Sequence, residues 1–192
     1  SVIGPIIGFF IIVLLALVFN SWSQSVMILT LLPIGIACAI LGHGIEGKPI
    51  SILSAYGIIG LSGVIINDAV VLLDQFNRRL KAGDSMYDAL LDAGVSRFRP
   101  ILLTSITTVA GLYPLILARS LQAQFLIPMA ISVAYGVLFG TAFILTYFPA
   151  FILLINDLRR LLFWIWNGRW PSREEVEPAI RKKKKIEKYE KG

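Results

Sequence analysis

The sequence has little of what an enzyme or a metal centre needs. Its only cysteine is Cys38 and its only histidine is His43, so it has no cysteine–histidine spacing for a metal. It also has no paired nucleophile and base and no glycine-rich phosphate loop. Cys38 lies in an apolar run and is expected to pack there. His43 falls in a predicted loop over residues 42–49, where we expect solvent exposure. The sequence thus predicts no enzyme activity, no cofactor and no metal site.

Charge is scarce over most of the chain. Residues 1–156 hold seven of the eighteen lysines and arginines, and the other eleven lie in residues 157–192. The formal net charge of +6 therefore reflects a basic tail rather than a surface for nucleic acid. Hydrophobic residues make up 56% of the chain, more than a soluble domain of this length needs. We therefore predict an integral membrane protein.

Five apolar runs are long enough to cross a bilayer as helices, which takes ~20 residues. They cover about residues 2–19, 25–41, 52–80, 101–118 and 125–155. A short amphipathic helix is predicted over Met86–Gly94, in the membrane–water interface, and Pro100 is expected to start the fourth span. The predicted fold is an all-α bundle of five transmembrane helices over residues 1–156. An amphipathic and basic tail over 157–192 follows, and we expect its end, from Arg181, to lack stable structure.

Positive charge sets the expected orientation of the spans. Lysine and arginine concentrate in the connection between the third and fourth spans and in the tail, so both are expected in the cytoplasm. The two regions are separated by two spans, so the two assignments agree. Five spans then place Ser1 on the outer side of the membrane. The Lys182–Lys185 run is predicted to be a solvated flank, although it could also bind anionic lipid.

One ionisable side chain interrupts the third span. Asp68 follows Asn67 and lies ten residues before Arg78, which is ~15 Å along a helix and about halfway across the hydrocarbon core. Placing a charge there costs at least ~2.5 kcal/mol, so such residues usually serve ion or proton movement. The alternative is a protonated Asp68 that hydrogen-bonds a neighbouring helix as a packing contact.

The fourth span holds a cluster of hydroxyl groups, and its depth matches that of Asp68. The cluster consists of Thr104, Ser105, Thr107 and Thr108. Thr108 lies ~13 Å beyond Arg99, so the two polar sites can meet if the spans pack together. Gly57, Gly60 and Gly63 on the third span and Gly111 on the fourth would permit that close approach. The alternative is that the hydroxyls bond the preceding turn of their own helix.

Three segments resemble a known family. Residues 60–79 (GLSGVIINDAVVLLDQFNRR), 96–117 (SRFRPILLTSITTVAGLYPLIL) and 120–154 (SLQAQFLIPMAISVAYGVLFGTAFILTYFPAFILL) are similar to resistance–nodulation–division (RND) exporters of the multidrug efflux branch. The resemblance covers about residues 1–158 and implies the last five of twelve transmembrane helices. Such pumps are proton-driven trimers of the bacterial inner membrane that work with a periplasmic adaptor and an outer-membrane channel.

The resemblance also implies roles for individual residues. Asn67 and Asp68 fall in the proton-relay segment, Thr104 matches the relay threonine, and Arg97 matches a basic residue at the cytoplasmic end. Well-known drug pumps have Lys-Asn at the first pair, so Asp68 must titrate itself or pair with a group outside this chain. The motif favours Thr104 as its partner, whereas depth favours Thr108.

The resemblance leaves the function of the chain partly open. The first seven helices and the substrate-binding porter domains are not in this sequence, so we expect no transport by the chain alone. One alternative is a protein-export accessory subunit of the same superfamily, whose relay motifs are similar. Another is a membrane scaffold or assembly partner without transport activity.

Overall fold

The computed structural model describes residues 21–181 and 183, so the first predicted span and most of the Lys182–Lys185 run lie outside the described residues. This part consists of helices and their connections and contains no strand. The helices are α2 (Trp22–Leu29), α3 (Leu31–Glu46), α4 (Ile52–Ala82), α5 (Met86–Ile116) and α6 (Leu121–Asn167). Four segments are long and apolar enough to cross a membrane: Ser23–Glu46, Ile52–Ala82, Met86–Ile116 and Leu121–Asn167. They correspond to the second to fifth predicted spans, although α5 ends at Ile116 rather than at residue 118. The predicted all-α membrane bundle is confirmed.

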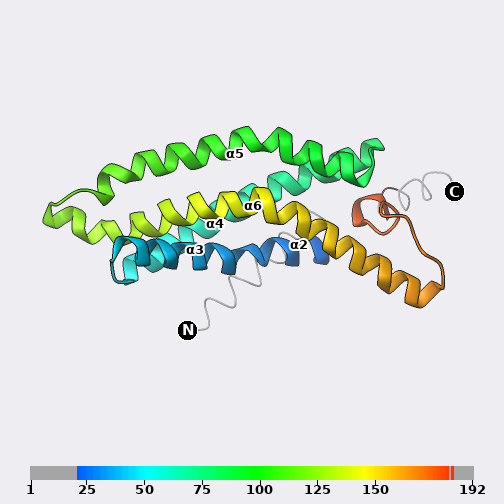
Figure 1. Cartoon of the computed structure of the whole chain (residues 1–192), viewed down its shortest axis with the longest axis horizontal. Helices are drawn as coiled ribbons and strands as arrows, with labels where there is room; N and C mark the ends of the chain where they lie inside the picture. Colours follow the sequence, from blue (N-terminus) through cyan, green and yellow to red (C-terminus); the bar gives the residue numbers. More distant parts are fainter. Residues whose placement is uncertain (1–20, 182, 184–192) are drawn as a thin grey trace.

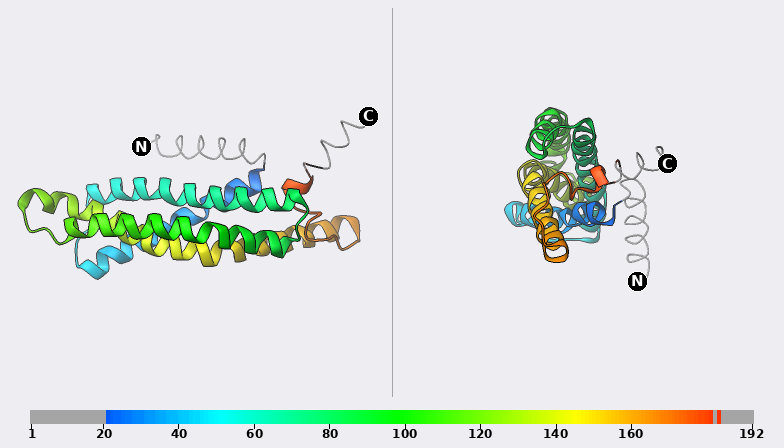
Figure 2. Two further views of the ribbon diagram at one scale, coloured as in Figure 1. Left: turned by 90° about the horizontal axis from the view of Figure 1, so that it is seen from above. Right: turned by 90° about the vertical axis from the view of Figure 1, so that its right-hand side faces the viewer.

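The long helices lie lengthwise beside one another in an elongated bundle (Figures 1 and 2). One end holds the α3–α4 and α5–α6 connections. The opposite end, called the tail end below, holds the α4–α5 connection and residues 168–181 (Figure 1). Helices α4 and α6 run in the same direction and α5 runs against both. The core lies along the seam between α4 and α6, with Leu61, Ile65 and Leu72 of α4 buried there.

Local signals fix the ends of α4. Ser51 and Ser54 form a capping box, in which the Ser51 hydroxyl accepts from the Ser54 backbone N–H at 3.3 Å. At the other end Gly83 adopts φ +109°, a left-handed conformation that favours glycine. The 31 residues between them span ~46 Å, more than the ~30 Å of a hydrocarbon core. Helix α4 is therefore longer than the hydrocarbon core is thick.

Glycines set the separation of α4 and α6, but not of α4 and α5. A Cβ atom on Gly57 would lie 2.7 Å from the backbone oxygen of Met129 in α6. Gly136 and Gly140 of α6 face Leu61 and Ile65 of α4 in the same way. By contrast, Cβ atoms on Gly60 and Gly63 would meet no neighbour within 4 Å among the described residues. The glycine-mediated approach predicted between the third and fourth spans is thus made by α6.

Substituting Gly57 by alanine is expected to destabilise the bundle by ~1–3 kcal/mol, because the added methyl group meets backbone and the two helices must separate. Gly60→Ala on the same helix is the matched control. It should be neutral or slightly stabilising, since alanine favours a helix by ~1 kcal/mol over glycine. Thermal unfolding of the detergent-solubilised protein measures both. Equal melting temperatures for the two variants would contradict this packing.

Two sequence expectations about helix boundaries were wrong. The predicted interfacial helix over Met86–Gly94 is not a separate element, because α5 continues through Pro100 to Ile116. A proline inside a membrane helix is tolerated where surrounding groups compensate for the lost hydrogen bond. His43 is not in a loop, because α3 continues to Glu46 and His43 is only 3% exposed. The helix containing the fifth span also continues past residue 155, to Asn167.

Candidate functional site

Asp68 lies on the buried face of α4. It is 8% exposed and shares this face with Ile65, Ala69 and Leu72. Its neighbour Asn67 is exposed, because successive residues of a helix point ~100° apart. Of the two adjacent residues, Asp68 thus has a buried carboxyl group and Asn67 has an exposed amide. Only the carboxyl group faces the packed interior of the described bundle.

The contacts of Ile65 fix the level of Asp68 in the bundle. Ile65 packs on Gly140 of α6, 3.4 Å from a Cβ atom built on that glycine, and it also faces Gly35 of α3. Asp68 is three residues further along α4, ~4.5 Å nearer the tail end. Within residues 21–181 its carboxyl group makes no hydrogen bond or ion pair. A charged carboxylate without partners is unfavourable in such a place.

The threonines of α5 bond to their own helix. The Thr104 hydroxyl donates to the Ile101 carbonyl at 2.9 Å, and the Thr108 hydroxyl donates to the Thr104 carbonyl at 2.7 Å. Thr107 likewise donates to carbonyls of the preceding turn. Thr104 is exposed and Thr108 is partly exposed. The structure therefore does not bring either residue into hydrogen-bond contact with Asp68, and their relay roles stay predictions.

The hydroxyl pair that joins two helices is a different one. Ser105 of α5 and Thr141 of α6 have their oxygens 2.5 Å apart, and they are 2% and 4% exposed. Thr141 follows Gly140, so this pair lies within about one helical turn of the level of Asp68. Sequence reasoning placed Ser105 in the hydroxyl cluster but gave Thr141 no role. The sequence feature that could have pointed to Thr141 is its position as a polar residue beside a glycine in an otherwise apolar run.

Arg97 occupies the part of α5 between this pair and the tail end. It is partly buried, and its Nε atom is buried without a hydrogen-bond partner among the described residues. Five residues before it, Asp92 accepts a hydrogen bond from Gln75 of α4 at 3.3 Å. Because α4 and α5 are antiparallel, Arg97 lies at a level between Gln75 and Asp68. Arg97 and Asp68 form no ion pair in the part of the chain that the structure describes.

Comparison with known proteins identifies the family. The model of the AcrB/AcrD/AcrF family matches residues 1–156, which is most of the chain. The chain belongs to this family of RND transporters. The resemblance of the three sequence segments to RND exporters is therefore confirmed at the level of the family. The assignment to the multidrug branch stays a prediction.

Named RND relatives include proteins of metal resistance. The chain is 30% identical over 149 residues to "Cobalt-zinc-cadmium resistance protein CzcA" of Cupriavidus metallidurans and to "Cation efflux system protein CzcA" of Alcaligenes sp.. Each match covers 78% of this chain and 14% of the relative. A solved structure described as a heavy metal efflux pump matches with a TM-score of 0.70 and 28% identity, covering 80% of this chain and 15% of that one. The chain thus spans about a seventh of the length of these RND proteins.

Polar contacts at the tail end hold this RND segment together. Gln24 of α2 and Asn77 of α4 exchange two buried amide hydrogen bonds of 3.0 and 3.1 Å. Arg79 of α4 makes a two-pronged bond to Asp92 of α5, with both distances 2.6 Å. Such paired geometry fixes orientation as well as distance. The end of α4 that follows Asp68 is therefore attached to both α2 and α5.

The segment after α6 folds back onto the same end. Glu177 is 1% exposed and accepts hydrogen bonds from Arg159 at 2.9 and 3.0 Å and from the Asn156 amide at 2.7 Å. Arg159 also contacts Ser23 of α2. These residues form what we call the tail clip: Asn156, Arg159 and Glu177. Sequence reasoning treated the tail as an amphipathic and basic anchor and did not single out this cluster.

Glu174 of the same segment caps α5. Its carboxylate accepts from the Met86 backbone N–H at 3.0 Å, at the N-terminus of the helix. Burial by itself would raise the pKa of Glu174, but the hydrogen bonds from Met86 and other donors outweigh it and lower the pKa. A carboxylate at this position also interacts favourably with the helix dipole. This bond adds to the cap formed by Ser85, whose hydroxyl accepts from the Asp88 backbone N–H at 3.2 Å, and the two together fix the start of α5 at Met86.

Proposed function

We propose that this chain is the C-terminal membrane part of a proton-driven RND efflux pump and that Asp68 carries the proton. The observation that supports the proposal most is a carboxyl group 8% exposed in the α4–α6 seam, with no partner among the described residues. A neutral, protonated Asp68 is compatible with that surrounding. An ionised one is not, unless the helices rearrange or a cation approaches it.

The proposed mechanism uses this difference between two protonation states. Proton binding to Asp68 favours the packed arrangement of α4 against α6. Proton release leaves a charge that draws α4 toward a cation or toward water, and the attachments of α4 at the tail end transmit that movement to α2 and α5. Arg97, whose Nε atom is buried without a hydrogen-bond partner among the described residues, is one candidate for that cation. A group on helices outside this chain is the other candidate.

The proposal gives a different role to three more exposed residues: Asn67, Thr104 and Thr108. Asn67 and Thr104 are exposed and Thr108 is partly exposed. We propose that they face the other helices of the pump and complete the relay there. A hydroxyl that already donates to its own backbone can still accept a hydrogen bond, so Thr104 and Thr108 remain able to accept from a group arriving from outside.

The substrate class is proposed from the relatives. The motif resemblance predicts export of drugs or other small amphipathic molecules, whereas the names of the relatives favour a divalent metal cation. We propose the metal cation, as substrate of the whole pump. The porter domains that would select it are outside this chain. The whole pump is further proposed to be a trimer in the inner membrane with an adaptor and an outer-membrane channel, and the tail end is proposed to be cytoplasmic.

Transport by the complete pump tests this choice. In proteoliposomes with an imposed pH gradient, zinc, cobalt or cadmium should move and a fluorescent drug such as an amphipathic dye should not. Collapsing the gradient with a protonophore should stop metal movement, because the proton supplies the driving force. Dye movement without metal movement would overturn the metal assignment and restore the drug prediction. Metal movement that persists without any gradient would overturn proton coupling.

A further inference from the structure

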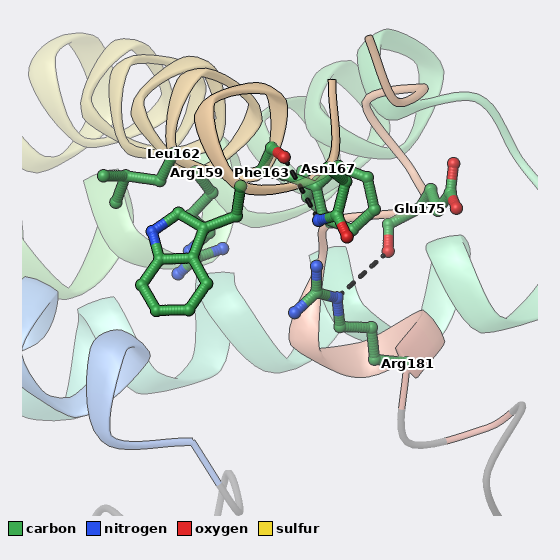
Figure 3. Close-up of a pocket in the computed structure, with 8 residues that line it drawn as sticks. Arg159, Leu162, Phe163, Asn167, Glu175 and Arg181 are labelled. Atoms are coloured by element: carbon green, nitrogen blue, oxygen red, sulfur yellow. Dashed lines mark hydrogen bonds between the residues drawn. The ribbon is translucent and has the colours of Figure 1, made fainter. Parts of the chain in front are cut away.

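A pocket of about 670 Å³ opens at the tail end, between the last turns of α6 and the folded-back segment (Figure 3). Helix α6 gives it an apolar wall, and arginine and glutamate side chains line the rest. The residues that matter here are Arg159, Leu162, Phe163, Trp166, Glu175 and Arg181. Every residue that lines the pocket lies in residues 159–181, at least 91 residues after Asp68 (159 − 68), and none belongs to the proposed relay. Its combination of an apolar wall and cations is what an amphipathic anion requires.

Exposed aromatic residues surround this pocket at the end of α6. Trp166 is 85% exposed, Ile165 is 62% exposed and Trp164 is 46% exposed, so apolar side chains point outward on several sides of α6. Tryptophan gathers where the hydrocarbon region meets the headgroups. Arg160 stacks on Trp170 at 5.0 Å in the same region. These side chains favour a position for the end of α6 at the membrane–water interface, near the level of the lipid headgroups.

Arg181 is the cation that the pocket leaves available. Its Nε atom donates to the Glu175 carbonyl at 3.3 Å, and its guanidinium group lies 5.6 Å from the Phe163 ring centre (Figure 3). Its two terminal nitrogens bond no other described residue. Arg159 is already bound to Glu177, and the Glu175 carboxylate is bound to Arg169 at 2.5 Å. Among the described residues, Arg159 pairs with a carboxylate and Arg181 does not.

We propose that this pocket binds the phosphate of an anionic phospholipid from the leaflet at the tail end. The terminal nitrogens of Arg181 donate paired hydrogen bonds to the phosphate oxygens, a geometry that guanidinium favours. Leu162, Phe163 and Trp166 contact the glycerol and the first acyl carbons. The apolar wall distinguishes this occupant from a free phosphate ion, which gains nothing from it. The net negative charge distinguishes it from a zwitterionic lipid, whose ammonium group the arginines repel.

Lipid retention by the complete pump tests the proposal. The pump is reconstituted in nanodiscs with equal phosphatidylglycerol and phosphatidylcholine, and the lipids retained after mild detergent release are counted by native mass spectrometry. Wild type should retain phosphatidylglycerol in excess, and Arg181→Gln should lower that excess about fivefold, the effect of one cation at an anionic surface. Arg78→Gln, which removes an exposed arginine of α4 outside the pocket, should leave the excess unchanged. Arg181→Lys keeps the positive charge, so this variant should retain part of the phosphatidylglycerol excess.

The remaining outcomes would overturn the proposal. An Arg181→Gln pump that melts like wild type and retains as much phosphatidylglycerol shows that no such site exists. Equal losses in Arg181→Gln and Arg78→Gln show that the lipid responds only to overall charge. If excess inorganic phosphate displaces the lipid from wild type, the pocket is a site for a free anion. All of these results are independent of proton coupling, so the test does not depend on Asp68.

Discussion

Replacing Asp68 by asparagine is expected to abolish proton-coupled transport by the complete pump while leaving its assembly near normal. Asparagine has nearly the same shape and keeps hydrogen-bonding capacity, but it cannot bind and release a proton. Because the position is 8% exposed, the neutral amide should fit the seam at least as well as a carboxyl group. Initial rates of substrate uptake into everted membrane vesicles measure the effect, with trimer content measured by native electrophoresis.

Asp74→Asn is the matched control for this prediction. Asp74 lies on the same helix, and its side chain, 46% exposed, pairs at 2.8 Å with that of Arg78, which is 73% exposed. Exposed pairs of this kind contribute ~0–1 kcal/mol, so transport should continue. Asp68→Glu is expected to retain part of the activity, because it titrates but adds one methylene to the seam. Wild-type transport by Asp68→Asn under a pH gradient would show that Asp68 serves only in packing.

Replacing Glu177 by alanine is expected to release the folded-back segment from the bundle. Glu177 is buried and neutralises Arg159, whose side chain is only 18% exposed. Removing one partner of a buried ion pair typically costs ~3–5 kcal/mol, because the other charge stays buried without compensation. The Asn156 amide loses an acceptor as well. Hydrogen exchange should show reduced protection across residues 171–181 and at the start of α5, where Glu174 would no longer be held in place.

Glu175→Gln provides the comparison for this second prediction. Glu175 lies two residues away on the same segment, and its partner Arg169 is 66% exposed. Loss of that exposed pair should change exchange protection little. If Glu177→Ala and Glu175→Gln give the same protection as wild type, the tail clip does not hold the segment. A double change of Arg159 and Glu177 to apolar residues should restore much of the docking, since it removes both buried charges.

The positions of the membrane spans could be predicted from sequence because they depend on long apolar runs and on scarce charge. The residues at which α3 ends and α5 begins could not be predicted. Gly42 and Gly44 around His43 read as a loop, yet Gly42 is the point where Tyr135 of α6 packs closely on α3. Pro100 read as a helix start, yet α5 already has a helix cap at Ser85 and its first turns are bonded to α4. In both cases a tertiary contact overrides a local signal.

The candidate site could likewise be predicted from sequence only in part. The burial of Asp68 followed from its place within an apolar run. The direction of each hydroxyl did not, since Thr104, Ser105 and Thr108 lie within five residues and only Ser105 bonds another helix. Depth alone cannot choose among neighbouring residues that point in different directions. The tail clip could not be predicted because it joins residues about twenty apart through a reversal of the chain at Gly168, whose φ is +68°.

The claim that Asp68 carries the proton is tested most directly by infrared difference spectroscopy of the reconstituted pump. Spectra recorded across a pH step should contain a band from a protonated carboxyl group that decreases as the pH rises and shifts in heavy water. We predict that this band is present in wild type and in Asp74→Asn and is missing in Asp68→Asn. A carboxyl band that is unchanged in Asp68→Asn would contradict the account and place the proton carrier elsewhere in the pump.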